Sequence, residues 1–177
     1  MGGWIKVVAC LWVVLVGATG CASEVMTHTV TIDERFDEEQ RAIIVDALDQ
    51  WKLALPGTYV ASHVFGKTTC NQPYAIHFVE EMDHCNSVGD IIDGRSPLGH
   101  ANENHARITI RGELTDMVLL QTIIHEQGHT FGASHTTRHV DVMNATDSHD
   151  TCIAENTLDG ICDEYGCDAP SVPSCSE

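Results

Sequence analysis

The feature that most constrains this 177-residue chain is the segment 125–135, which spells HEQGHTFGASH. Apolar residues recur at helical spacing just before it, and they predict a helix over residues 115–131. On such a helix His125 and His129 are four residues apart, so they lie one turn above each other on the same face. Two imidazole nitrogens placed in this way can bind one Zn²⁺ ion at about 2.0–2.1 Å.

Further residues of this segment complete a metal site of the catalytic type. Gly132 is expected to end the helix, because glycine tolerates the left-handed conformation found at helix ends, and His135 then returns as a third ligand. Three protein ligands leave a fourth position for water, as in catalytic zinc sites. Glu126 is rotated by about 100° from His125, so its carboxylate can hold that water and take its proton. No Ser/His/Asp or Cys/His arrangement competes with this site.

The pattern H-E-x-x-H-x-x-G-x-x-H resembles that of the metzincin zinc metallopeptidases and is most similar to their matrixin branch. Metzincins also place a methionine-containing turn, the Met-turn, beneath the zinc. Here Met143 follows His135 by eight residues, which is a matrixin-like interval. Asn144 and Ala145 depart from the residues usual in matrixins, and Ala145 stands where astacins have a zinc-facing tyrosine. These departures indicate a divergent bacterial matrixin-like group, and the specific resemblance covers residues 115–143.

The resemblance implies an α+β metzincin-like fold, with a twisted, mostly parallel sheet and two long helices above a zinc cleft. A small C-terminal subdomain with one helix is expected below the cleft. The chain that follows the first 20 residues is long enough for one domain with its own core. We therefore predict one catalytic domain over residues 22–177, with an upper subdomain at about 25–132 and a lower one at about 133–177.

Local patterns predict the same order of elements. The expected strands are 25–32, 59–65, 74–79 and 106–111, and the expected helices are 37–55, 115–131 and 154–165. Asp37 with Gln40 three residues later resembles a capping box at a helix start. The glycine-rich segment 86–104 is predicted to be a long loop. The family fold would make 106–111 the sheet edge above the cleft, where an extended peptide can add as a strand.

The N-terminus has the features of an export signal. Lys6 precedes an apolar core of about ten residues, which is the length of a signal peptide and too short for a permanent membrane span. The following small residues and Cys21 resemble a bacterial lipobox. We predict a signal peptide over residues 1–20, lipidation of Cys21, and a lipoprotein anchored at the outer membrane or cell surface. The alternative is a secreted protein cleaved near Ala22.

Six cysteines follow Cys21, and an even number in an exported chain indicates three disulfides. Proximity favours a Cys70–Cys85 pair and two bridges among the four C-terminal cysteines. A zinc site is the alternative for those four, but their spacing lacks the close C-x₂₋₄-C pairs of zinc ribbons. The candidate disulfide cysteines are Cys70, Cys85, Cys152, Cys162, Cys167 and Cys175.

The remaining histidines raise the question of a second metal. Matrixins often hold a structural zinc with histidines and an aspartate upstream of the catalytic helix. The spacing here does not reproduce that site, so we expect these side chains to be exposed or hydrogen-bonded: His63, His77, His84, His100 and His105. His139 and His149 lie off the motif, and we exclude them as ligands.

The net charge of the chain limits the kinds of molecule that it is expected to bind. The chain has 9 basic and 26 acidic residues, a formal net charge of −17, which argues against nucleic acid. Acidity is compatible with calcium sites or cationic substrates. Calcium is common in metzincins, but no contiguous calcium loop is visible. We expect a monomer that acts on proteins or peptides and meets the membrane only through its lipid anchor.

The predicted function is therefore zinc-dependent endopeptidase activity on extracytoplasmic proteins, with Glu126 as general base. The rival hypothesis is a catalytically silent zinc-binding surface lipoprotein or interaction module. It shares the ligands but has no need of Glu126, so this glutamate favours the enzyme. A third hypothesis is a hydrolase that acts on a bond other than a peptide bond, and the family resemblance argues against it.

Overall fold

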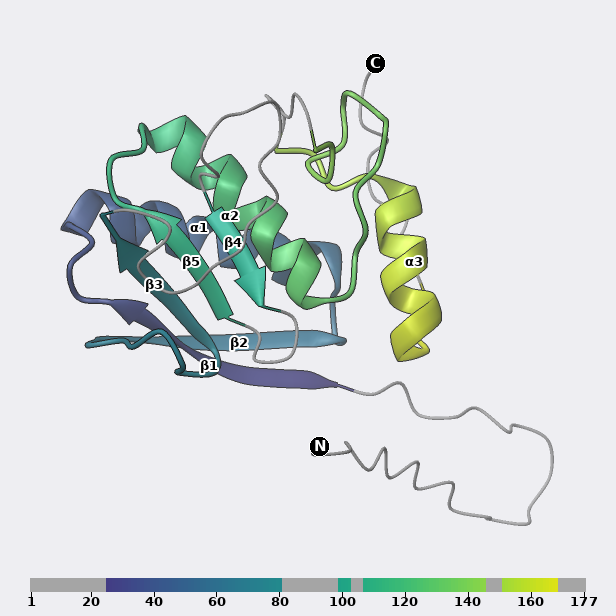
Figure 1. Ribbon diagram of the computed structural model, residues 1–177. Coiled ribbons are helices and arrows are strands. Elements are labelled where there is room, and N and C mark those ends of the chain that lie inside the picture. The colour runs from purple at the N-terminus through teal and green to yellow at the C-terminus, as the bar shows by residue number, and fades with distance from the viewer. Residues whose placement is uncertain (1–24, 81–98, 103–106, 146–150, 169–177) are drawn as a thin grey trace, which may run out of the picture.

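The computed structural model describes residues 25–80, 99–102, 107–145 and 151–168. Within these residues the chain forms one sheet and three helices. In chain order the elements are β1 (Met26–Asp33), α1 (Glu38–Ala54), β2 (Tyr59–Gly66), β3 (Ala75–Val79), β4 (Gly99–Asn102), β5 (Arg107–Arg111), α2 (Asp116–Thr130) and α3 (Glu155–Tyr165). Figure 1 shows α1 and α2 side by side and α3 beyond the C-terminal end of α2.

The five strands lie in the order β2-β1-β3-β5-β4. The first four run parallel to one another, and β4 pairs with β5 antiparallel. The mostly parallel sheet predicted from the sequence is thereby confirmed. No helix among the described residues has both the length and the apolar composition needed to cross a membrane.

Helix α1 begins where its capping residues predict. The Asp37 carboxylate accepts a hydrogen bond from the backbone N–H of Gln40 at 2.9 Å, and the Gln40 side chain accepts one from the backbone N–H of Asp37 at 3.1 Å. This reciprocal pair satisfies two backbone donors that the helix itself leaves without a partner. The chain then turns at Gly57, whose φ of +76° is the left-handed conformation that favours glycine.

The core lies between the sheet and helices α1 and α2. Successive strand residues point to opposite faces, and one face of the sheet joins the helices in a single buried cluster. Its central members are Ile32, Ile44, Leu48, Trp51, Ile76, Ile108, Ile110, Leu119 and Ile123. The indole N–H of Trp51 donates to the carbonyl oxygen of Ile124 at 3.0 Å. This bond joins α1 to the helix that carries the HExxH segment.

Two predictions about the sheet edge are wrong. Residues 99–102, expected to lie in a loop, form strand β4 at the edge, and residues 107–111, expected at the edge, form β5 inside the sheet. Strand β4 has only four residues, including a glycine, so it carries no alternating pattern. It is a strand because it pairs antiparallel with β5, and a strand defined by its partner has no signal in its own four residues.

The structure contains a disulfide between Cys162 and Cys167, with 4.5 Å between their Cα atoms. Cys70 and Cys152 are also disulfide-bonded. Cys21, Cys85 and Cys175 lie outside the described residues, so the predicted lipidation and the remaining pairings stay predictions.

A buried carboxylate lies on the face of the sheet opposite the helices. Asp33 is 1% exposed, and its carboxylate accepts hydrogen bonds from Arg35 Nη2 at 2.7 Å and from the hydroxyl of Thr68. The Nδ1 atom of His77 is 3.2 Å away. Burial alone raises the pKa of the Asp33 carboxyl, but the hydrogen bonds from Arg35 and Thr68 outweigh it and hold this pKa well below its usual range.

The location of the core makes opposite predictions for two leucines of α1. Leu48 is 1% exposed and Leu53 is 79% exposed. We expect Leu48→Ala to lower the free energy of unfolding by about 2–5 kcal/mol, because it leaves a cavity. The same substitution at Leu53 should change it by no more than about 0.5 kcal/mol. Urea unfolding of both variants tests this, and equal losses would mean that α1 does not present this face to the sheet.

The environment of Asp33 predicts a dependence of stability on pH. Its folded-state pKa lies below the unfolded value of about 4, so the ionised carboxylate stabilises the fold above that pH and the stabilisation is lost as the pH falls below it. Wild type should therefore be more stable than Asp33→Asn at neutral pH, and the difference should shrink below about pH 4. Urea unfolding between pH 3 and 7 measures this. A difference that persists undiminished at pH 3 would contradict it.

Candidate metal centre

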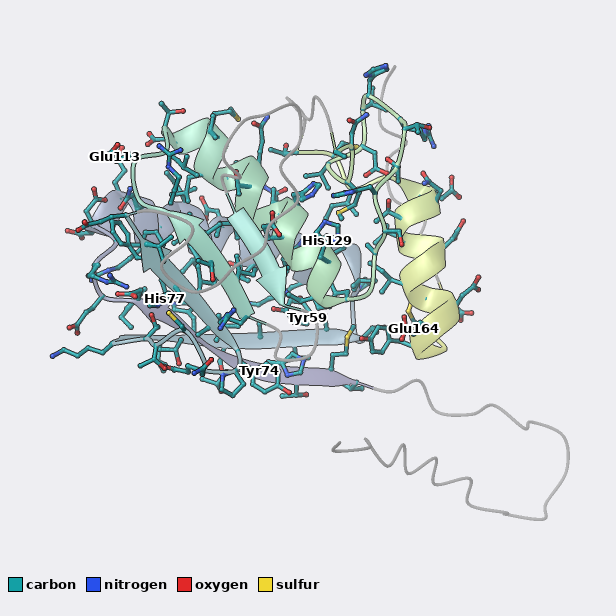
Figure 2. All side chains as sticks on the ribbon, in the orientation of Figure 1. Tyr59, Tyr74, His77, Glu113, His129 and Glu164 are labelled. Carbon is teal, nitrogen blue, oxygen red and sulfur yellow. A yellow bond between two sulfur atoms is a disulfide. The ribbon has the colours of Figure 1, made fainter. Side chains whose placement is uncertain are left out.

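Three imidazole nitrogens converge at the C-terminal end of α2. The Nε2 atoms of His125 and His129, one helical turn apart, are 3.1 Å from each other, and the Nε2 atom of His135 lies 3.2 and 3.0 Å from them. Among the described residues, no other group of three or more His, Cys, Asp or Glu side chains is placed to hold a metal ion. Figure 2 shows His129 near the end of α2, between that helix and the chain that leads to α3.

The end of α2 brings the third histidine to this point. The backbone N–H of Ala133 donates to the carbonyl of Gly128 and that of Gly132 to the carbonyl of His129, each at 3.0 Å. Gly132 has a φ of +86°. These two bonds with a left-handed glycine form the Schellman motif, which ends a helix and reverses the chain. The chain then leads back toward α2, and His135 approaches the two helical histidines.

The backbone sets the orientation and protonation of two of the rings. The Nδ1 atom of His125 lies 2.7 Å from the carbonyl oxygen of Val142, and that of His129 lies 2.8 Å from the carbonyl oxygen of Ala133. A carbonyl accepts only, so each Nδ1 carries the proton and each Nε2 keeps its lone pair for a ligand. Burial is the main cause that lowers the pKa of His125 to about 4, which favours its neutral, metal-binding form.

The geometry of the three nitrogens fits a zinc ion. Bonds of about 2.0–2.1 Å in a tetrahedron separate nitrogen ligands by about 3.3 Å, close to the observed 3.0–3.2 Å. Two of these lone pairs face the shared centre without a proton, so a cation there would satisfy them. A set of three imidazoles suits zinc, and the described residues contain no cluster of carboxylates of the kind that calcium prefers.

Glu126 directly follows His125 on α2 and is buried against the edge strand β4. It is 9% exposed, and burial raises its pKa to about 7, although a hydrogen bond from the backbone N–H of Ala101 acts in the opposite direction. That N–H belongs to the edge strand β4. A Cβ atom on Gly99 would lie 2.9 Å from Cγ of Glu126 and 2.7 Å from Cγ2 of Thr122. Glycine at this position therefore lets β4 approach α2 closely.

Met143 packs against α2 at Gly128, between the two histidines of the helix in sequence. Its side chain is fully buried, and a Cβ atom on Gly128 would lie only 2.4 Å from its sulfur and 3.2 Å from Cζ2 of Trp51. Gly128 thus leaves the space that Met143 occupies. The HExxH motif leaves this position unspecified, although a glycine in the interior of a helix signals a packing constraint. Asp141, a buried carboxylate in the turn before Met143, also lies outside the motif.

The other predicted histidines do not join this centre. His77 lies on the opposite face of the sheet beside Asp33, with its Nε2 atom 3.8 Å from the sulfur of Cys70. Neither His63 nor His139 belongs to the metal-binding group. The side chain of His100 and the whole of His84, His105 and His149 lie outside what the structure describes.

Comparison with known proteins supports the architecture. No family model matches the sequence, and no curated protein matches it. The chain is similar to the crystal structure of archaemetzincin from Methanopyrus kandleri, with a TM-score of 0.52 and 13% sequence identity over 77% of this chain and 93% of that chain. It is also similar to myroilysin, with a TM-score of 0.37 and 14% identity over 68% of this chain and 53% of that chain. The likeness to archaemetzincin shows a metzincin-like fold.

The contact between Gly128 and Met143 predicts that Gly128→Ala is destabilising. Alanine favours a helix over glycine by about 1 kcal/mol, but the added methyl group would clash with Met143, and overpacking costs about 1–3 kcal/mol. We expect a net loss in urea unfolding, reduced when Met143→Ala is combined with it. Gly160→Ala in α3 is the control, because nothing lies within 4 Å of its added Cβ, and it should be neutral or stabilising. Equal effects at both glycines would refute the packing argument.

Proposed function

We propose that this protein is a zinc-dependent endopeptidase of the metzincin type, most similar to matrixins in its motif. One observation carries the proposal: three histidine Nε2 atoms lie within 3.0–3.2 Å of one another, and a buried glutamate lies next to them on the same helix. The archaemetzincin-like fold supports it. A purely structural zinc site would be closed by four protein ligands, whereas three histidines leave a position for water.

The residues of the chain divide the chemistry among them. His125, His129 and His135 would hold the zinc, which supplies Lewis-acid activation of water and of the scissile carbonyl when bound. The carboxylate of Glu126 accepts a proton from the attacking water and delivers it to the nitrogen of the leaving amine.

Strand β4 is the element best placed to align a peptide. As the edge of the sheet it has backbone groups that β5 does not pair, and an extended peptide can add to such an edge. It also contacts α2, and the backbone N–H of Ala101 meets the Glu126 carboxylate. We therefore propose residues 99–102, in place of 106–111, as the strand with which a substrate pairs. A peptide at this edge would pass beside the general base.

The proposal extends to extracytoplasmic substrates. It rests on residues 1–21, which have the composition of a signal peptide with a lipobox-like end. The mass of the mature N-terminus would distinguish lipidation at Cys21 from cleavage near Ala22. An acidic enzyme would favour cationic segments of its substrates.

The decisive variant is Glu126→Gln, which keeps the volume of the side chain and removes its basic carboxylate. We expect zinc at about one per chain in wild type and variant alike, and casein or peptide cleavage at least about 100-fold slower in the variant. Removing zinc with a chelator should abolish wild-type cleavage, and added zinc should restore it. Metal analysis with initial-rate assays measures both quantities.

Glu113→Gln is the matched control, because Glu113 is an exposed glutamate three residues before the same helix (Figure 2). It should keep both zinc and activity. If wild type binds zinc but neither wild type nor Glu126→Gln cleaves any protein in a broad panel, the endopeptidase proposal fails and the zinc-binding module takes its place.

A further inference from the structure

Asp141 is a buried carboxylate for which the proposed reaction has no use. Its side chain is fully buried, and three groups of the described residues donate hydrogen bonds to it. Oδ2 accepts from the hydroxyl of Thr157 at 2.7 Å and from that of Thr136 at 3.1 Å, and Oδ1 accepts from the backbone N–H of Met143 at 3.1 Å. Among the described residues, no lysine, arginine or histidine forms an ion pair with it. A charge buried without a cation is costly.

The three donors belong to three different segments of the chain. Thr136 is the residue after the ligand His135, Met143 packs against Gly128 of α2, and Thr157 lies in the first turn of α3. The backbone repeats the connection, since the N–H of Thr136 donates to the carbonyl of Met143 at 2.9 Å. One carboxylate therefore fixes three segments relative to one another. They are the residues that follow His135, the turn at Met143, and α3.

Asp141 also acts on the first ligand through its neighbour. Val142 follows it directly, and the carbonyl of Val142 accepts the hydrogen bond from His125 Nδ1 at 2.7 Å. Asp141 precedes Val142 and Met143 follows it. The N–H of Met143 donates to the Asp141 carboxylate, so this bond holds the turn on both sides of the Val142 carbonyl. The orientation of the His125 ring thus depends on the conformation that Asp141 stabilises, and partners of this kind tune metal affinity.

The charge of Asp141 has a separate effect. Three imidazoles are neutral ligands, so a zinc ion among them keeps its full charge of about +2 in a partly buried place. A buried anion nearby offsets part of this charge in a medium where screening is weak. Asp141 directly precedes Val142, whose carbonyl bonds to His125, so its negative charge favours a cation bound to that ring.

From these contacts we propose that Asp141 is a positioning residue of the metal centre, which sets its zinc affinity through hydrogen bonds to Thr136, Met143 and Thr157 and through its buried negative charge. The proposal rests on zinc as the metal of the proposed function. It does not depend on peptide cleavage, because its measurement is metal affinity.

The test compares Asp141→Asn with Asp33→Asn. Both substitutions are isosteric, both remove a buried hydrogen-bonded carboxylate, and Asp33 lies on the opposite face of the sheet. Zinc dissociation constants are measured by chelator competition at a temperature where each apo protein is folded, and Co²⁺ absorption spectra report ligand geometry. We expect zinc binding about 10–100-fold weaker in Asp141→Asn, with an altered cobalt spectrum, and a change below about threefold in Asp33→Asn.

A second pair of variants keeps the test decisive if Asp141→Asn fails to fold. Thr157→Val removes the shortest hydrogen bond to Asp141 and should weaken zinc binding several-fold, whereas Thr157→Ser keeps the hydroxyl and should restore wild-type affinity. Unchanged zinc affinity and cobalt spectrum in Asp141→Asn, or in Thr157→Val if only that variant folds, would overturn the proposal and leave Asp141 a purely structural anchor. So would equal weakening in Asp33→Asn.

The outcome for Asp141 is separable from the outcome for the enzyme. Wild type that binds zinc and cleaves nothing would end the endopeptidase proposal and leave the role of Asp141 standing on its affinity data. Wild type that binds no zinc would overturn both.

Discussion

The convergence of three imidazole nitrogens on one point is the constraint on which this structure depends. The three nitrogens lie 3.0–3.2 Å apart, and the two whose lone pairs carry no proton repel each other until they share a cation. Holding the rings in place therefore needs partners that fix their orientation. Two backbone carbonyls do so, from Val142 and Ala133, and both lie in chain that follows α2. The site is thus built jointly by the helix and by the segment that returns beneath it.

Close packing connects the metal-binding segment to the hydrophobic core. Gly128 admits the side chain of Met143, and Trp51 of α1 contacts the same glycine and bonds to the carbonyl of Ile124. Phe131, at the end of α2, packs edge-on against Trp51 with ring centroids 5.1 Å apart. Protein interiors lack free volume, so a shift of α1 would displace the methionine and the ends of the metal-binding segment together. The two helices and the turn behave as one packed unit.

The sequence alone predicted those parts of the molecule that depend on residues close to one another in the chain. The capping residues of α1, the helical period of α2 and the spacing of the three histidines and Gly132 each depend on residues a few positions apart, and the structure has those elements close to their predicted bounds. Strand β4 was missed because it exists only through its pairing with β5. Gly128 and Asp141 were missed for a related reason. Their roles depend on side chains 15 and 16 residues away, namely Met143 and Thr157.

The dependence of the site on α3 follows from the same contacts. Leu158 and Ile161 of this helix enter the common core, which fixes its position, and Thr157 then presents its hydroxyl to Asp141. The far end of the helix is closed by a left-handed Gly166 and by the Cys162–Cys167 disulfide. A disulfide that restrains this end limits fraying of a short helix. Oxidation of these two cysteines thereby helps to hold α3 in the position from which Thr157 donates its hydrogen bond to Asp141.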